Sequence, residues 1–241
     1  IMGRAFEFRK ARKLKRWSAM AKTFTRIGKE LSMAVKDGGP NPEINSKLRA
    51  IIQNAKAVNM PKNNIERAIK KASEKSSENY KEILFEGYGP KGVAILIETA
   101  SNNNNRTVAN IRSYFNKFDG NLGTSGSVEF MFERLCCFKI KTDLKIDDLE
   151  FELIDFGLEE AVKDENNDQY YLYSMFDSFG TIQKELEKRQ IEIISSEFQR
   201  VPKQYKYLKK DDIIAVENLM EAIEEDDDVQ NIYHNMELSQ E

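Results

Sequence analysis

The sequence predicts an α+β protein, with an N-terminal three-helix domain followed by two ferredoxin-like βαββαβ domains, the last inserted into the middle one. Apolar residues in the first 72 positions recur every three or four residues, which is the helical period. After Tyr80, short apolar runs of strand length alternate with helical patterns, and this series occurs twice, one copy interrupting the other. We expect a basic helical domain at residues 1–78, a ferredoxin-like domain at 79–133 plus 203–241, and an inserted ferredoxin-like domain at 134–202.

The first helix is expected from about Lys15 to Lys36. Its apolar stripe would consist of Trp17, Ala21, Phe24, Ile27, Leu31 and Val35. At 100° per residue, five cations fall within roughly 80° on the opposite side: Lys15, Lys22, Arg26, Lys29 and Lys36. This arrangement predicts a helix with one core face and one solvent-exposed cationic ridge. The segment from Gly38 to Pro42 ends the helix.

Two shorter helices complete the first domain. One is expected from about Ser46, which would cap it, to Val58. The other begins near Asn63, which would act as a cap together with Glu66 three residues later. In this helix Ile65, Ala68, Ile69 and Ala72 would be buried, while Arg67, Lys70 and Lys71 stay outside. A polar linker follows at residues 73–78.

The next domain begins with two strands, at 83–86 and 93–99, separated by a segment that matches GxGxxG. Because a strand follows this segment where a nucleotide site needs a helix N-terminus, we interpret it as a turn. A helix is expected around Val108 to Phe115, preceded by a cap region at 105–107, and a strand at 127–133. The remaining elements are a strand at 205–208, a helix at 211–225 and a strand at 229–234.

The inserted segment repeats the alternation. Strands are expected at 137–141, 159–163, 170–175 and 191–198, with one helix containing Ile146 and Leu153 and another containing Ile182 and Leu186. The resulting order is the ferredoxin-like split βαβ.

Charge is distributed very unevenly along the chain. Of 37 lysines and arginines, 18 lie within residues 1–72 together with five of the 40 acidic residues, so this part carries a net charge of +13 and the rest −16. A segment so basic is suited to a polyanion such as nucleic acid. The residues that we expect to contact phosphates are Arg4, Arg9, Lys10, Arg12, Lys13, Lys15, Arg16, Lys22, Arg26, Lys29, Lys36, Lys62, Arg67, Lys70 and Lys71. Phe6 and Phe8 either stack on unpaired bases or pack against the helices.

Several other classes of function find little support. Cys136 and Cys137 are adjacent, which disfavours a disulfide, and one histidine, His234, is too little for a zinc site or a Ser-His-Asp triad. The acidic run 224–228 is interpreted as a solvated helix end. We therefore expect no catalytic residues, no metal and no cofactor. No apolar run approaches the roughly 18 residues of a membrane span, and nothing directs export, so a cytoplasmic protein is expected.

Several longer blocks resemble the YebC/PmpR family of probable transcriptional regulators, which also includes mitochondrial translational activators. The blocks lie at residues 20–30, 48–71, 85–93, 105–109, 120–128 and 228–235, and include Asn-Met-Pro-Lys-Asn-Asn-Ile-Glu-Arg-Ala-Ile-Lys-Lys and Gly-Asn-Leu-Gly-Thr-Ser-Gly-Ser-Val. Residues 134–200 match only loosely. The resemblance implies three domains, with the third inserted into the second.

The resemblance also implies DNA binding and gene regulation for some members and action on the ribosome for others, with no catalytic residues. Many members begin Gly-His-Ser-Lys-Trp, whereas this chain has Gly3 followed by Arg-Ala-Phe-Glu-Phe, so a role of that histidine does not carry over. The sequence thus predicts a DNA-binding transcriptional regulator or, alternatively, a translation factor that binds ribosomal RNA or tRNA on the ribosome. Protein partners at the acidic domains are a further expectation.

Overall fold

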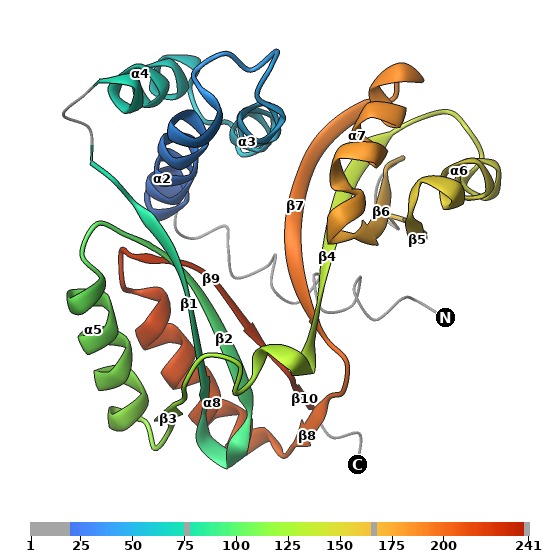
Figure 1. Ribbon diagram of the computed structural model, residues 1–241. Coiled ribbons are helices and arrows are strands. Elements are labelled where there is room, and N and C mark those ends of the chain that lie inside the picture. The colour runs from blue at the N-terminus through green and yellow to red at the C-terminus, as the bar shows by residue number, and fades with distance from the viewer. Residues whose placement is uncertain (1–19, 75–77, 165–167, 239–241) are drawn as a thin grey trace. The chain divides into compact units, whose positions relative to one another are not determined.

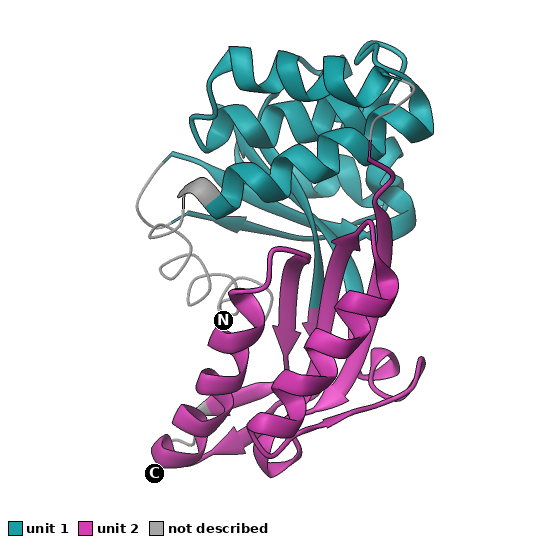
Figure 2. Ribbon diagram, turned by 90° about the vertical axis from the view of Figure 1, so that its left-hand side faces the viewer, with its two compact units in different colours: residues 1–75, 134–200 teal, residues 76–133, 201–241 magenta. Residues whose placement is uncertain are grey.

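A computed structural model describes residues 20–74, 78–164 and 168–238 of the chain (Figure 1). The chain divides into two compact units, one within residues 1–75 and 134–200 and the other within 76–133 and 201–241 (Figure 2). Each unit is made by two separate stretches of sequence, because strands β4 (Phe132–Lys141) and β7 (Glu192–Pro202) carry the chain from one unit to the other and back.

Three helices form the first part of unit 1: α2 (Met20–Gly38), α3 (Ser46–Ala57) and α4 (Lys62–Ser73). The apolar stripes found in the sequence meet in one hydrophobic cluster, in which Leu31, Leu48 and Ala55 are completely buried. Burying a leucine side chain stabilises a fold by roughly 1.5–3 kcal/mol, so this small cluster holds the three helices together.

The connection between α2 and α3 depends on Asn45, which caps α3 in place of the expected Ser46. Its Oδ1 accepts a 3.0 Å hydrogen bond from the backbone N–H of Leu48, and its Nδ2 donates to the carbonyl oxygens of Ala34 and Gly39 at 2.8 and 2.9 Å. At α4 the N-cap is Pro61, without a side-chain hydrogen bond, so Asn63 does not act as a cap.

The other part of unit 1 is a four-stranded sheet with the order β5-β6-β4-β7. Its elements are β4, α6 (Ile146–Leu153), β5 (Leu158–Lys163), β6 (Tyr170–Met175), α7 (Phe179–Lys188) and β7. Side chains from both helices, Leu149, Leu153, Ile182 and Leu186, form one cluster with strand residues such as Phe138 and Leu172. This is the strand order of the split βαβ motif.

Unit 2 contains a second four-stranded sheet, with the order β3-β1-β2-β9, and a two-stranded sheet of β8 and β10. In chain order the elements are β1 (Lys81–Tyr88), β2 (Ala94–Ser101), α5 (Asn104–Lys117), β3 (Asn121–Leu122), β8 (Lys206–Leu208), α8 (Lys210–Glu224), β9 (Val229–His234) and β10 (Met236–Leu238). Helices α5 and α8 contribute Ile111, Phe115, Val216, Leu219 and Ile223 to a common hydrophobic cluster with the sheet.

The α+β class, with N-terminal helices followed by antiparallel sheets, is confirmed. Unit 2 departs from the regular βαββαβ order because β1 and β2 form a hairpin without a helix between them. The GxGxxG segment is the turn of this hairpin, closed by a 2.8 Å hydrogen bond from Gly89 N–H to Val93 O. The strand expected at 127–133 is instead a short 3-10 turn, Glu129–Met131, followed by β4.

Candidate nucleic-acid interface

The first seven of the predicted phosphate-contacting residues, Arg4 to Arg16, lie outside the described residues. The other eight lie on α2 and α4. The four on α4 are exposed, whereas three of the four on α2 are half-buried or buried.

Helix α4 presents a continuous cationic face. Lys62, Arg67, Lys70 and Lys71 are all exposed, and at 100° per residue they fall within about 180° of the helix circumference. One acidic residue shares this face: Glu66, whose carboxylate lies 3.6 Å from the Lys62 ammonium. Both side chains of this pair are largely solvated, so the pair is weak and leaves Lys62 available to a stronger anion.

The sequence of α4 determines which side its cations occupy. Ile65 and Ala72 are buried in the helical cluster, and Ala68 and Ile69 pack against it. Lys70 and Lys71 lie in the last turn, where positive charge interacts favourably with the helix dipole. The cations are therefore held at fixed positions along one rigid helix.

The cationic ridge expected on α2 is not a free surface. Lys29 is buried, with 8% of its surface exposed, and Lys22 and Arg26 are half-buried. Met33, on the same side of the helix, is buried as well, so α2 is covered on both faces. Lys36, near the end of the helix, is exposed as expected.

Arg49 on α3 has a structural role that the sequence did not indicate. Its Nη1 donates to the carbonyl oxygen of Pro42 at 2.9 Å, and its Nε donates to the Glu187 carboxylate at 3.0 Å. Asn54, one turn further along α3, donates to and accepts from the backbone of Ser196 in β7. These side chains serve the internal cohesion of unit 1.

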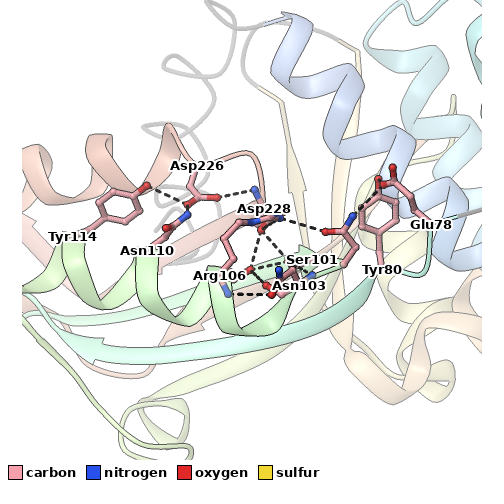
Figure 3. A network of polar contacts seen from close by, with 11 residues as sticks. Glu78, Tyr80, Ser101, Asn103, Arg106, Asn110, Tyr114, Asp226 and Asp228 are labelled. Atoms are coloured by element: carbon pink, nitrogen blue, oxygen red, sulfur yellow. Dashed lines mark hydrogen bonds and ion pairs between the residues drawn. The ribbon is translucent and has the colours of Figure 1, made fainter.

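The acidic residues after α8 form a polar network (Figure 3), where a solvated helix end was expected. Asp228 is buried, and its Oδ2 accepts hydrogen bonds from Ser101 Oγ at 2.9 Å, Thr107 Oγ1 at 2.9 Å and Arg106 Nη2 at 2.7 Å. The hydrogen bond that Arg106 donates to Asp228 is the main reason why the pKa of Arg106 is raised. The expectation is therefore wrong for Asp228, whose carboxylate is engaged inside the fold.

Asp226 extends the same network to the middle of α5. Its Oδ2 accepts from Asn110 Nδ2 at 2.9 Å and from the Tyr114 hydroxyl at 3.1 Å. Burial, followed by the charge of Asp226, raises the pKa of Tyr114. Since both carboxylates accept hydrogen bonds from side chains of α5, the network fastens this helix to the segment that precedes β9.

A second buried carboxylate, Glu86 on β1, shapes the loop before β4. Its two oxygens accept from the backbone N–H groups of Gly126, Val128 and Glu129 at 2.6–2.7 Å. Convergent backbone N–H groups form a site that can bind an anion. Here the bound anion is the Glu86 carboxylate of the same chain. The loop is therefore held rigidly, and Phe130 at its end is 65% exposed.

Other chemistry finds no support in the described residues. Burial raises the pKa of the Cys136 thiol to about 12, which keeps it protonated and unreactive. Among the residues that the structure describes, no three His, Cys, Asp or Glu side chains are grouped so that they could hold a metal ion. Within the same ranges no helix combines the length and the apolar character that crossing a membrane requires.

Comparison with known proteins places the chain in a family. Residues 4–75 match the TACO1/YebC protein N-terminal domain, and residues 80–236 match the TACO1/YebC second and third domain. The chain is 67% identical, over 98% of its length and 100% of the relative's, to a protein of Flavobacterium psychrophilum named probable transcriptional regulatory protein. A protein of Myxococcus xanthus with the same name is 47% identical, over 98% and 100% of the two chains.

One solved structure is similar over most of its length. The crystal structure of a conserved hypothetical protein from Aquifex aeolicus has a TM-score of 0.77 and 34% sequence identity, covering 93% of each chain. With both family domains matched in order and full-length relatives above 60% identity, the chain belongs to the TACO1/YebC family.

Proposed function

We propose that this protein is a regulator of gene expression that binds DNA through its basic N-terminal part and acts in the cytoplasm without catalysis. The observation that carries the proposal is the exposed face of α4, with Lys62, Arg67, Lys70 and Lys71 on one rigid helix. The relatives named probable transcriptional regulatory proteins support it, since a regulator of transcription needs access to DNA.

The chemistry of the face suits phosphates better than base edges. Lysine and arginine contacts to the backbone provide affinity and orientation without reading the sequence. Each neutralised phosphate releases counterions, so binding should weaken linearly in log–log coordinates as salt rises. Because Lys22, Arg26 and Lys29 are wholly or partly covered, we assign the dominant described contacts to α4 and leave the α2 residues a supporting role.

The test uses the full chain and a 30-base-pair duplex, with affinity measured between 50 and 200 mM salt. Changing Lys62, Arg67, Lys70 and Lys71 together to Gln should reduce the salt slope by roughly 3 to 4, because the slope is about 0.9 per phosphate contact. The control variant carries Gln at four exposed lysines of the inserted segment, Lys141, Lys145, Lys163 and Lys184, and loses the same net charge. Equal weakening of both variants would show that α4 has no particular role.

The ribosome is the second candidate, because ribosomal RNA offers the same phosphates to α4. Lysine contacts to phosphates do not read base edges, so a target recognised by its shape suits α4 as well as a DNA duplex does. Crosslinking in cells, followed by identification of the bound nucleic acid, separates the two. Promoter DNA supports the first proposal, and ribosomal RNA or tRNA the second.

We further propose that the chain has three domains, at residues 1–78, at 79–133 with 203–241, and at 134–202. Three separate hydrophobic clusters support this division, because each combines residues of one of these ranges. The acidic surfaces of the last two would face protein partners. Limited proteolysis that cuts first within the linker expected from the sequence at residues 73–78 and leaves two fragments intact is the expected result.

A further inference from the structure

Helix α6 of the inserted segment carries large apolar side chains on two opposite faces. Leu149 and Leu153 are completely buried and belong to the hydrophobic cluster beneath the helix. Phe151 lies on the other side and is 82% exposed, and Ile154, directly after the helix, is 60% exposed. At 100° per residue, Phe151 and Ile154 lie within about 60° of each other around the helix axis. The outward face of α6 therefore presents two adjoining apolar side chains to solvent.

Carboxylates surround this apolar pair. Three exposed aspartates lie within about 60° of Phe151 around the helix axis: Asp147, Asp148 and Asp155. Residues 143–160 as a whole contain eight acidic residues and one lysine. Burial, followed by the charge of Glu150 on α6, raises the pKa of Glu160 on the adjoining strand β5. The negative charge thus continues from the helix to the edge of the sheet.

The inserted segment neutralises one flank of α6 only. Arg189, at the end of α7, pairs with Glu152 at 3.2 Å, and its guanidinium lies 5.5 Å from the centre of the Phe156 ring. Among the residues that the structure describes, the three aspartates around Phe151 make no ion pair with a lysine or arginine. Isolated exposed apolar side chains are common, whereas adjoining ones with a polar rim mark interaction sites. The outward face of α6 has both the apolar pair and the rim.

We propose that the outward face of α6, formed by Phe151 and Ile154 with the three aspartates, is a docking site for a basic amphipathic segment of another protein. The inference rests on the proposed function, in which the acidic domains face protein partners, and it names the surface and the chemistry of the partner. Apolar side chains of the segment would cover Phe151 and Ile154, and its lysines and arginines would contact the carboxylates. An aromatic anchor supplies much of the binding energy, while charges at the rim increase the association rate.

Charge and apolar character together select this occupant. A second copy of the chain bound through its own α6 would bring two acidic faces together, and like charges across an interface are costly. The cationic face of α4 in a second copy would match the charge, but every exposed side chain of α4 is polar or charged, so none would cover Phe151. A segment that supplies both cations and apolar side chains satisfies both parts of the α6 face.

The direct test titrates the full chain with a fluorescent fourteen-residue helical peptide of leucine and lysine, with the leucines on one face. Phe151→Ser should weaken binding roughly thirtyfold, the effect of losing an aromatic anchor. Ile214→Ser is the matched control, because Ile214 is 48% exposed on the acidic helix α8 and should leave the affinity unchanged. Equal weakening by both changes, or no weakening by Phe151→Ser, overturns the proposal.

The aspartates are tested by charge. Asp147, Asp148 and Asp155 changed together to Asn should remove most of the salt dependence of peptide binding. The control variant changes three exposed carboxylates elsewhere, Glu43, Glu133 and Asp211, to amides and should keep that dependence. Asp155→Asn alone, outside the first turn of α6, should weaken binding in the same direction and serves if the triple change unfolds the helix. Equal behaviour of the α6 and control variants would refute a specific face.

Photocrosslinking in cells identifies the natural occupant. The photoreactive amino acid p-benzoylphenylalanine replaces Phe151 in one variant and Ile214 in the other, and the crosslinked peptides are sequenced by mass spectrometry. A segment of another protein with positive net charge and apolar residues at helical spacing, captured at 151 only, supports the proposal. A crosslink to a second copy of this chain or to its own residues 4–16, the same segment captured at both positions, or no crosslink at 151 overturns it.

The same experiment separates this inference from the proposed function. Protein capture at 214 without capture at 151 would refute the α6 site and leave the acidic surfaces as the place where partners bind. Failure at both positions would contradict both statements. The variant of α4 with four glutamines should lose duplex binding while keeping peptide binding, so DNA binding is tested independently of the α6 face.

Discussion

The guanidinium of Arg106, in the first turn of α5, donates a 2.7 Å hydrogen bond to the carboxylate of Asp228, just before β9 (Figure 3). The two side chains are 122 positions apart in sequence and differ in exposure, since 48% of the arginine side chain is exposed against 5% of the aspartate. Replacing Arg106 and replacing Asp228 should therefore change the stability of the fold to different extents.

Asp228→Ala should destabilise unit 2 by roughly 2–4 kcal/mol. The change removes the acceptor of the buried Ser101 hydroxyl and of Arg106, and an unsatisfied buried polar group costs about 1–3 kcal/mol. The Thr107 hydroxyl also loses its bond to Asp228 but keeps the carbonyl oxygen of Asn103 as an acceptor at 3.1 Å. Arg106→Gln should cost clearly less, because the arginine is half solvated and Asp228 keeps its two hydroxyl donors. Urea unfolding of both variants checks the order, and an equal loss would contradict the role assigned to the hydroxyls.

Glu86→Gln should destabilise the fold by about 2–3 kcal/mol. A carboxylate can accept from all three backbone N–H groups of Gly126, Val128 and Glu129, whereas an amide turns one donor toward them. Glu82→Gln on the same strand is the control, because Glu82 is exposed and should change stability by less than about 0.5 kcal/mol. Amide exchange at Val128 should also accelerate selectively in the Glu86 variant.

Asn45→Ala should lower the stability of the helical part by about 2 kcal/mol. It removes the cap of α3, worth about 1 kcal/mol, and two further hydrogen bonds to the end of α2. Ser46→Ala serves as the neighbouring control, since Ser46 is exposed and does not cap the helix. Thermal unfolding followed by circular dichroism distinguishes the two, and a larger effect of Ser46→Ala would refute the capping assignment.

Stability should fall as the pH rises from about 9 to about 12, in part because of Cys136. Burial raises its pKa from 9.0 to about 12, so the thiol ionises first in the unfolded chain, and the stability it contributes is present below pH 9 and lost above. Tyr80, whose pKa burial and Glu78 raise from 10.0 to about 12, adds to the upper part of this range. In a Cys136→Ala variant the loss between pH 8 and pH 10 should be smaller than in the wild type. Identical profiles would contradict the assignment.

The helical pattern was sufficient to locate α2, α3 and α4 because each helix has one apolar stripe, and on α4 it also identified the exposed cations. It was insufficient on α2. A 3.6-residue period reveals the face that packs on α3 and α4, but nothing in it tells that Lys29 and Met33 on the other side are also covered.

The polar networks could not be predicted for a related reason. A carboxylate such as Asp228 looks solvated in an acidic run, and its burial depends on hydroxyls more than a hundred residues away. Glu86 likewise looks like a surface residue of an amphipathic strand until the loop at 126–129 folds around it. The local sequence pattern shows the periodicity of a helix or strand. The hydrogen-bond partners of a buried polar group depend on which distant segments the fold brings next to it.

The two strands that carry the chain between the units, β4 and β7, are neighbours in one sheet. Adjacent strands lie only about 4.8 Å apart, so the segment between them begins and ends at nearly the same point. For the unit 2 core, the whole insertion therefore acts as one loop whose ends are already joined once its own sheet has formed. Since closure entropy rises only slowly with loop length, β1, β2 and β9 can assemble during folding almost as if residues 134–200 were a short hairpin.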